Sequence, residues 1–81
     1  MNNGIQMHDV VVLLEDTRTR HFKTGQAFVL QRGQVGAVVM TYDGSAFEVE
    51  FADPQGRPYA LLPIPAEKLL ALKDTPELAT A

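Results

Sequence analysis

The segment that most constrains the fold is residues 46–52, in which apolar and acidic side chains alternate. Phe47, Val49 and Phe51 fall on one face of an extended chain, and Glu48 and Glu50 fall on the other. A period of two predicts a β-strand with one buried face, so these three apolar residues are assigned to the core. Asp43-Gly44, just before this strand, is a strong hairpin signal because it tolerates positive φ. Residues 34–42 and 46–52 are therefore predicted to form an antiparallel pair.

The rest of the chain supplies further short strands and no helix-length amphipathic repeat. A turn is predicted at Asp53-Pro54-Gln55-Gly56, and Pro58 is expected at the start of a strand or on an edge strand. The remaining expected elements are strands at 10–14, 57–62 and 69–72, with the 57–62 strand ended by Pro63-Ile64-Pro65 and a helical turn at 66–68. The predicted fold is all-β, a small SH3-like barrel of about five strands.

A long first loop, residues 15–32, is unusual for so small a domain. Within it, residues 26–30 have strand character and are expected either to form an extra β-arm or to pack back on the mouth of the barrel. Residues 7–73 are predicted to be the folded domain. The polar segment 1–6 and the tail 74–81 are expected to be disordered, since they contain too few apolar side chains to offset ordering entropy.

Several motifs resemble a family of small bacterial proteins known only as a domain of unknown function. They are the Asp9-Val10-Val11 opening, Arg32-Gly33-Gln34-Val35-Gly36, the run from Tyr42-Asp43-Gly44 to Phe51, and Tyr59-Ala60-Leu61-Leu62. The resemblance implies an SH3-like barrel and no established activity. It does not extend to 18–28, which looks like an insertion. Gly33 and Gly36 are also similar to the glycines at a strand start in KOW-type barrels, and are expected to permit a bulge or a positive φ.

Composition excludes several kinds of chemistry. The 81 residues include no cysteine, so disulfides and thiolate zinc sites are impossible, and the two histidines are far apart in the sequence. No apolar run approaches the roughly 20 residues that span a bilayer. Glu48 and Glu50 are interpreted as surface charges that discourage sheet-to-sheet pairing on a strand prone to lie at an edge. We therefore expect a cytoplasmic protein that is not an enzyme, with no catalytic residues, no metal site and no cofactor.

The net charge of -3 hides an uneven distribution. Between residues 17 and 34 there is no acidic residue, whereas four of the seven lysines and arginines lie there. The candidate binding residues in this basic loop are Arg18, Arg20, His21, Phe22, Lys23 and Arg32. Such a loop could bind a phosphate backbone and stack a base, although four cations predict weak and salt-sensitive binding.

The function predicted from these features is protein binding. Tyr42 and Tyr59 are added to the candidate binding residues, because aromatic side chains contribute amphipathic contact surface in small barrels. The expected partner is another protein, for which the product of a neighbouring gene is a candidate, and the chain itself is expected to be a monomer or a homodimer. Two alternatives stay open: weak, KOW-like nucleic-acid binding through the basic loop, and docking as an electron-transfer subunit.

Overall fold

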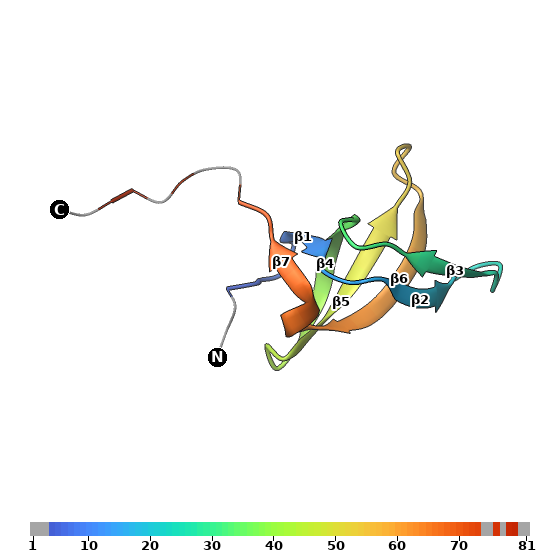
Figure 1. Cartoon of the computed structure of the whole chain (residues 1–81), viewed down its shortest axis with the longest axis horizontal. Helices are drawn as coiled ribbons and strands as arrows, with labels where there is room; N and C mark the ends of the chain where they lie inside the picture. Colours follow the sequence, from blue (N-terminus) through green and yellow to red (C-terminus); the bar gives the residue numbers. More distant parts are fainter. Residues whose placement is uncertain (1–3, 74–75, 77, 80–81) are drawn as a thin grey trace.

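A computed structural model describes residues 4–73, 76 and 78–79, and it is all-β apart from one short helical turn (Figure 1). Five antiparallel strands form a curled sheet in the order β6-β5-β4-β1-β7, so the last strand pairs with the first. The bounds are β1 Val10–Leu13, β4 Val35–Tyr42, β5 Ala46–Ala52, β6 Pro58–Pro65 and β7 Leu69–Ala71, with the 3-10 helix η1 at Ala66–Lys68. The predicted small barrel, including the helical turn before its last strand, is confirmed.

The β4–β5 hairpin has the turn that its sequence predicts. Tyr42 pairs with Ala46, and the Ser45 N–H donates to the Tyr42 carbonyl oxygen at 3.1 Å. Asp43 and Gly44 have φ values of 56° and 73°, the conformation that residues of these two types tolerate best. The turn after β5 is also confirmed, since the Gly56 N–H donates to the Asp53 carbonyl oxygen at 2.8 Å.

The core lies on the inward face of the sheet, as the alternation in β5 predicts. Phe47, Val49 and Phe51 are 1%, 0% and 0% exposed, and they pack with buried residues from the other strands of the barrel. The expectation that this strand would be prone to lie at an edge is wrong, because β5 pairs with β4 on one side and with β6 on the other. Glu48 and Glu50 are half-buried on the outer face of a central strand and do not protect an edge.

The two glycines before and within β4 serve different purposes. Gly33 has a φ of 96°, which confirms the expected left-handed conformation at this corner. Gly36 has no positive φ, and the irregularity in β4 lies further along, between Val38 and Met40. Gly36 is instead buried against β5, where an added Cβ would lie 2.7 Å from Val49 Cγ1. The expectation of a bulge or positive φ is therefore wrong for Gly36.

Strand β6 extends beyond its predicted end. The prolines at 63 and 65 were expected to terminate it, but Pro63 pairs with Glu48 and Pro65 with Ala46. They alternate with Ile64, so both missing N–H groups face the same side of the strand. Since β6 is at one end of the sheet order, that side needs no ladder hydrogen bonds, and proline is tolerated there.

The long first loop is a second, two-stranded sheet made of β2 (Thr17–Arg20) and β3 (Ala27–Leu30). Residues 17–30, named the arm below, project to the right in Figure 1, whereas β1 and β7 lie to the left. The strand character of 26–30 is confirmed as β3, and the structure has the expected β-arm, which also packs back against the barrel through Phe28 and Leu30. Strand β2 was not predicted, because Thr17-Arg18-Thr19-Arg20 contains no large apolar side chain.

The predicted disordered ends lie partly outside the described residues. Residues 1–3 and 74, 75, 77, 80 and 81 are not described, so nothing is concluded about them. Within the described part, Ile5 belongs to the hydrophobic core and is 4% exposed. The packed unit therefore includes a residue that precedes the predicted boundary at residue 7.

Candidate functional site

The register of the arm separates its side chains into two faces. Arg18 pairs with Val29 and Arg20 pairs with Ala27, and because side chains alternate along strands, these four share one face. All four are exposed, with Val29 at 46%. The opposite face carries Thr17, Thr19, Phe28 and Leu30, and it turns toward the core, where Leu30 is fully buried. The arm is thus a half-buried hairpin with a basic and aliphatic outer face.

Tyr59 of β6 holds the arm against the barrel. Its ring lies 5.7 Å from the ring of Phe28, centre to centre, and its hydroxyl accepts a hydrogen bond from Gln34 Nε2 at 2.9 Å. Its carbonyl oxygen accepts the Phe22 N–H at 3.2 Å. Tyr59 is half-buried in these contacts. It was predicted as a candidate binding residue, but its contacts in the structure serve to anchor the arm.

The tip of the arm is organised by His21. Its Nδ1 accepts the backbone N–H groups of Lys23 and Thr24 at 3.1 and 3.3 Å. The Phe22 ring is parallel to the His21 ring at 5.7 Å, and Lys23 Nζ lies 5.9 Å from the centre of the Phe22 ring. His21 is therefore used to shape the turn, while Phe22 and Lys23 are presented to solvent.

The cations of the arm form no ion pairs with any described residue. Arg20 donates from a terminal guanidinium nitrogen to the Gly25 carbonyl oxygen at 2.9 Å, and at the base of the arm Arg32 contacts Asp16 Oδ1 at 2.8 Å only through its backbone N–H. In contrast, the cations Arg57 and Lys68 elsewhere on the barrel lie 3.0 and 3.1 Å from the carboxylates of Asp53 and Glu15. The guanidinium charges of Arg18 and Arg20 thus remain available to an external anion.

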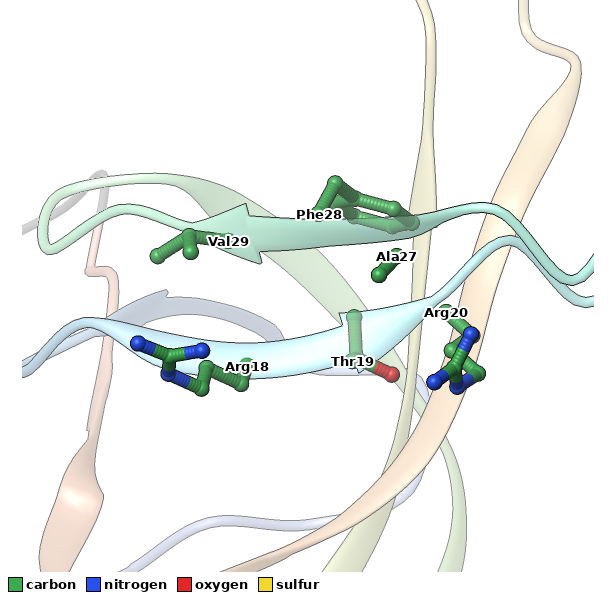
Figure 2. Close-up of a pocket in the computed structure, with 6 residues that line it drawn as sticks. All are labelled: Arg18, Thr19, Arg20, Ala27, Phe28 and Val29. Carbon is green, nitrogen blue, oxygen red and sulfur yellow. The ribbon is translucent and has the colours of Figure 1, made fainter.

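A hollow of about 440 Å³ lies at the arm, lined by Arg18, Thr19, Arg20, Ala27, Phe28 and Val29 (Figure 2). In Figure 2 the two arginine side chains extend from opposite ends of β2, with Val29 of β3 near Arg18 and Ala27 near Arg20. Positive charge and aliphatic surface therefore occur together within one short stretch of the arm.

Tyr42 is not part of this surface. It pairs with Ala46 at the beginning of β5, whereas the residues beside Tyr59 pair with Phe51 and Ala52 at the end of β5, so the two tyrosines lie at opposite ends of the strand. The Tyr42 hydroxyl donates to Glu48 Oε1 at 2.7 Å. This hydrogen bond, with smaller contributions from burial and from the Glu48 charge, raises the pKa of Tyr42.

The sequence does not predict the non-basic members of the surface, above all Val29 and Ala27. The signal that could have found them is the Thr-Arg-Thr-Arg alternation of residues 17–20, which has the period of a strand although it lacks large apolar residues. Once β2 is recognised as a strand, residues 26–30 become its hairpin partner, and the register places Val29 beside Arg18.

Within the described part of the chain, no group of three or more histidine, aspartate and glutamate side chains is placed to hold a metal ion. A search of the same residues finds no helix with the length and apolar character needed to cross a membrane.

Comparison with known proteins gives one match. The model of a family described as a domain of unknown function (DUF4926) matches residues 7–71, which include the whole arm and every strand of the barrel. No curated protein and no solved structure matches this chain.

Proposed function

This chain belongs to the DUF4926 family, and we propose that it is a non-enzymatic protein-interaction module whose binding surface is the outer face of the arm. The proposal rests mainly on one observation. Arg18 and Arg20 lie two residues apart on an exposed face, with aliphatic neighbours and with no carboxylate partner among the described residues. This combination suits an acidic surface of another protein.

The composition of the surface favours a protein partner. Arginine is enriched at protein interfaces because its planar guanidinium can bind a carboxylate bidentately and also pack against apolar groups. Val29, which pairs with Arg18, supplies such an apolar group and is 46% exposed. Contacts from Tyr59 to Phe28, to Gln34 and to Phe22 hold the hairpin in place. A preorganised surface loses less conformational entropy on binding, and this increases affinity.

Co-purification from the native host, with a tag at the C-terminus and expression at the endogenous level, tests the proposal. The wild-type chain is expected to retain a specific protein, and Arg18→Glu is expected to lose it. Lys73→Glu is the matched control, because it makes the same change in charge at an exposed residue after β7, outside the arm. Failure of the wild-type chain to retain any specific protein would refute the interaction role. Equal retention by both variants would place the binding surface elsewhere.

Nucleic-acid binding is the second candidate function, favoured by the tip of the arm. Phe22 is 49% exposed beside Lys23, and the cations Arg18, Arg20 and Arg32 lie on the arm or at its base. An exposed aromatic ring among cations can stack a base while the cations contact phosphates. Titration with single-stranded RNA and DNA at low and moderate salt tests this. Four phosphate contacts predict a slope of about -3 for log K against log salt. Flat titrations, or binding that survives replacement of all four cations, would exclude it.

A further inference from the structure

The arm has one strand edge that no other element of the described residues covers. In the described part of the chain β3 pairs with β2 alone. The His21 N–H donates to the Gln26 carbonyl oxygen at 2.8 Å, which identifies 21 and 26 as a hydrogen-bonded pair. Because hydrogen-bonded and non-hydrogen-bonded pairs alternate in an antiparallel ladder, the pairs of 20 with 27 and of 18 with 29 are non-hydrogen-bonded.

The backbone groups of Ala27 and Val29 therefore point away from β2. Outside the β2–β3 ladder, no hydrogen bond from either N–H to another described residue is present. The corresponding groups on the other side of the hairpin face β6, as the hydrogen bond from the Phe22 N–H to the Tyr59 carbonyl oxygen shows. Among the residues that the structure describes, the hairpin thus has one edge against the barrel and one free edge, which is the edge of β3.

We infer that an extended acidic segment of a partner protein binds by adding to this free edge as a third strand. The inference rests on the proposed function and specifies how the same surface recognises its partner. Backbone groups of the segment bond those of Ala27 and Val29, as in other cases of strand addition to a sheet edge. Side chains on one face of the segment lie over the outer face of the arm, where Arg18 and Arg20 supply the positive charge.

Charge complementarity determines the chemistry of the segment. Arg18 and Arg20 are separated by one residue on one strand, so carboxylates separated by one residue on an added strand match their spacing. An added strand would lie roughly 10 Å from β2, two strand spacings away. Extended arginine and glutamate side chains can meet across β3 over that distance, and the exposed Val29 and Ala27 lie beneath them. The residue between two such carboxylates faces the other side of the arm, where Phe28 lies, so an apolar residue is expected there and the predicted pattern is acidic–apolar–acidic.

Fluorescence anisotropy with the full chain and a labelled hexapeptide of alternating glutamate and valine tests this mode of binding. The matched control is a hexapeptide of the same composition in which three glutamates precede three valines. The alternating peptide is expected to bind at least about tenfold more tightly, a difference of about 1.4 kcal/mol. Equal affinities, or no binding by the alternating peptide, would overturn the inference.

Backbone methylation of the peptide tests the hydrogen bonds without altering the protein. In a β-strand, alternate N–H groups face the same edge, so N-methylation on only the glutamates or only the valines blocks only one edge of the peptide. One of these two peptides is expected to lose binding by about tenfold or more and the other to retain it. The amide protons of Ala27 and Val29 should also become protected from exchange when the unmethylated peptide saturates the chain. Equal binding of the two methylated peptides, or unchanged exchange at both amides, would refute strand addition.

Charge-reversal variants separate failure of this inference from failure of the proposed surface. Arg18→Glu is expected to weaken the alternating peptide about tenfold or more, and Lys73→Glu is expected to leave it unchanged. If Arg18→Glu weakens both peptide orders equally and methylation has no effect, the surface stands and strand addition is refuted. If Arg18→Glu has no effect on any peptide, the surface itself is refuted. A single-stranded oligonucleotide that binds more tightly than the alternating peptide would overturn the choice of a peptide partner.

Discussion

Replacing Gly36 by alanine tests how closely β4 approaches β5. Gly36 is buried opposite Val11 of β1, and its φ is not positive. A Cβ added at this position would lie 2.7 Å from Val49 Cγ1, 2.9 Å from the Glu50 carbonyl oxygen and 3.0 Å from Phe51 Cδ2. Carbon atoms in ordinary contact are about 3.5–4.0 Å apart. The Gly36→Ala variant therefore has to displace atoms of β5 or distort β4.

The size of the effect follows from two opposing contributions. Overpacking a well-packed core costs about 1–3 kcal/mol. The upper half of that range applies here, since one of the contacted atoms is a backbone oxygen within the β4–β5 pairing and cannot rotate away. Alanine regains about 0.5–1 kcal/mol over glycine by lowering the entropy of the unfolded chain. We expect a net loss of about 1–2.5 kcal/mol, which lowers the melting temperature of a domain this small by several degrees.

Urea denaturation of four chains measures this quantity and its cause: wild type, Gly36→Ala, Val49→Ala and the double variant. Val49→Ala removes the Cγ1 atom that makes the shortest contact, so Gly36→Ala should cost less in the Val49→Ala background. Gly44→Ala is the control for backbone strain alone, since Gly44 has a φ of 73° and open space around it. The loss of unfolding free energy caused by Gly44→Ala should be the same in the wild-type and in the Val49→Ala background. An undiminished cost of Gly36→Ala in the Val49→Ala background, or no cost at all, would refute the close-approach explanation.

Three further predictions concern the core and two titrating groups. Phe47→Ala or Phe51→Ala should each lower the free energy of unfolding by about 3–5 kcal/mol. Leu61→Ala, on the exposed outer face, should lower it by less than about 1 kcal/mol. An unchanged melting temperature in either phenylalanine variant would contradict the assigned inward face. The Arg57 N–H, with further hydrogen bonds from the Arg57 guanidinium and the Gln55 N–H, holds the pKa of Asp53 below its ordinary value. The stability advantage of wild type over Asp53→Asn should therefore be full at neutral pH and vanish as the pH falls below 3.8 through the pKa of the folded state; an advantage that persists in acid would contradict this. In the Tyr59→Phe variant the remaining tyrosine is Tyr42, so an absorbance titration reports on Tyr42 alone. Its midpoint should lie above 10.0 and should fall when Glu48 is changed to glutamine. A midpoint unaffected by Glu48→Gln would show that the hydrogen bond does not raise the pKa of Tyr42.

The parts of the fold that were predicted correctly are those encoded by neighbouring residues. The bounds of β5 follow from the alternation at 46–52, and the β4–β5 turn follows from Asp43-Gly44. The turn of 3-10 helix at 66–68 follows from three residues between a proline and an apolar run. Each of these signals lies within a few residues along the chain, so no knowledge of distant contacts is needed to interpret it.

The predictions that are wrong concern segments whose conformation depends on their place in the sheet or on a partner strand. Pro63 and Pro65 normally end a strand, but β6 lies at an edge where their missing N–H groups need no partner. The Thr-Arg-Thr-Arg segment 17–20 has no large apolar side chain, so its sequence predicts a loop. Its strand conformation depends on pairing with β3 and on the contact of Phe28 with Tyr59. Edge position and pairing are properties of the assembled sheet.

The same distinction applies to the candidate site. The cluster of cations between residues 17 and 34 is visible in the sequence, and so is its separation from the acidic strand. Tyr42 and Tyr59 were placed in the same set, yet Tyr59 anchors the arm while Tyr42 lies at the other end of β5. The two tyrosines thus make different contacts, because β4 and β6 place them at opposite ends of β5.

For this chain the sequence alone determines which side chains of a strand can share a face, because a period of two is a property of the extended backbone itself. It therefore assigned Phe47, Val49 and Phe51 to the core before any partner strand was known. Only the tertiary structure decides which strand edges are covered, since that depends on how the sheet curls and where the arm packs. The contact of the arm with Tyr59 covers the β2 side of the hairpin and leaves the backbone groups of Ala27 and Val29 without a partner among the described residues, with Arg18 and Arg20 on the exposed face.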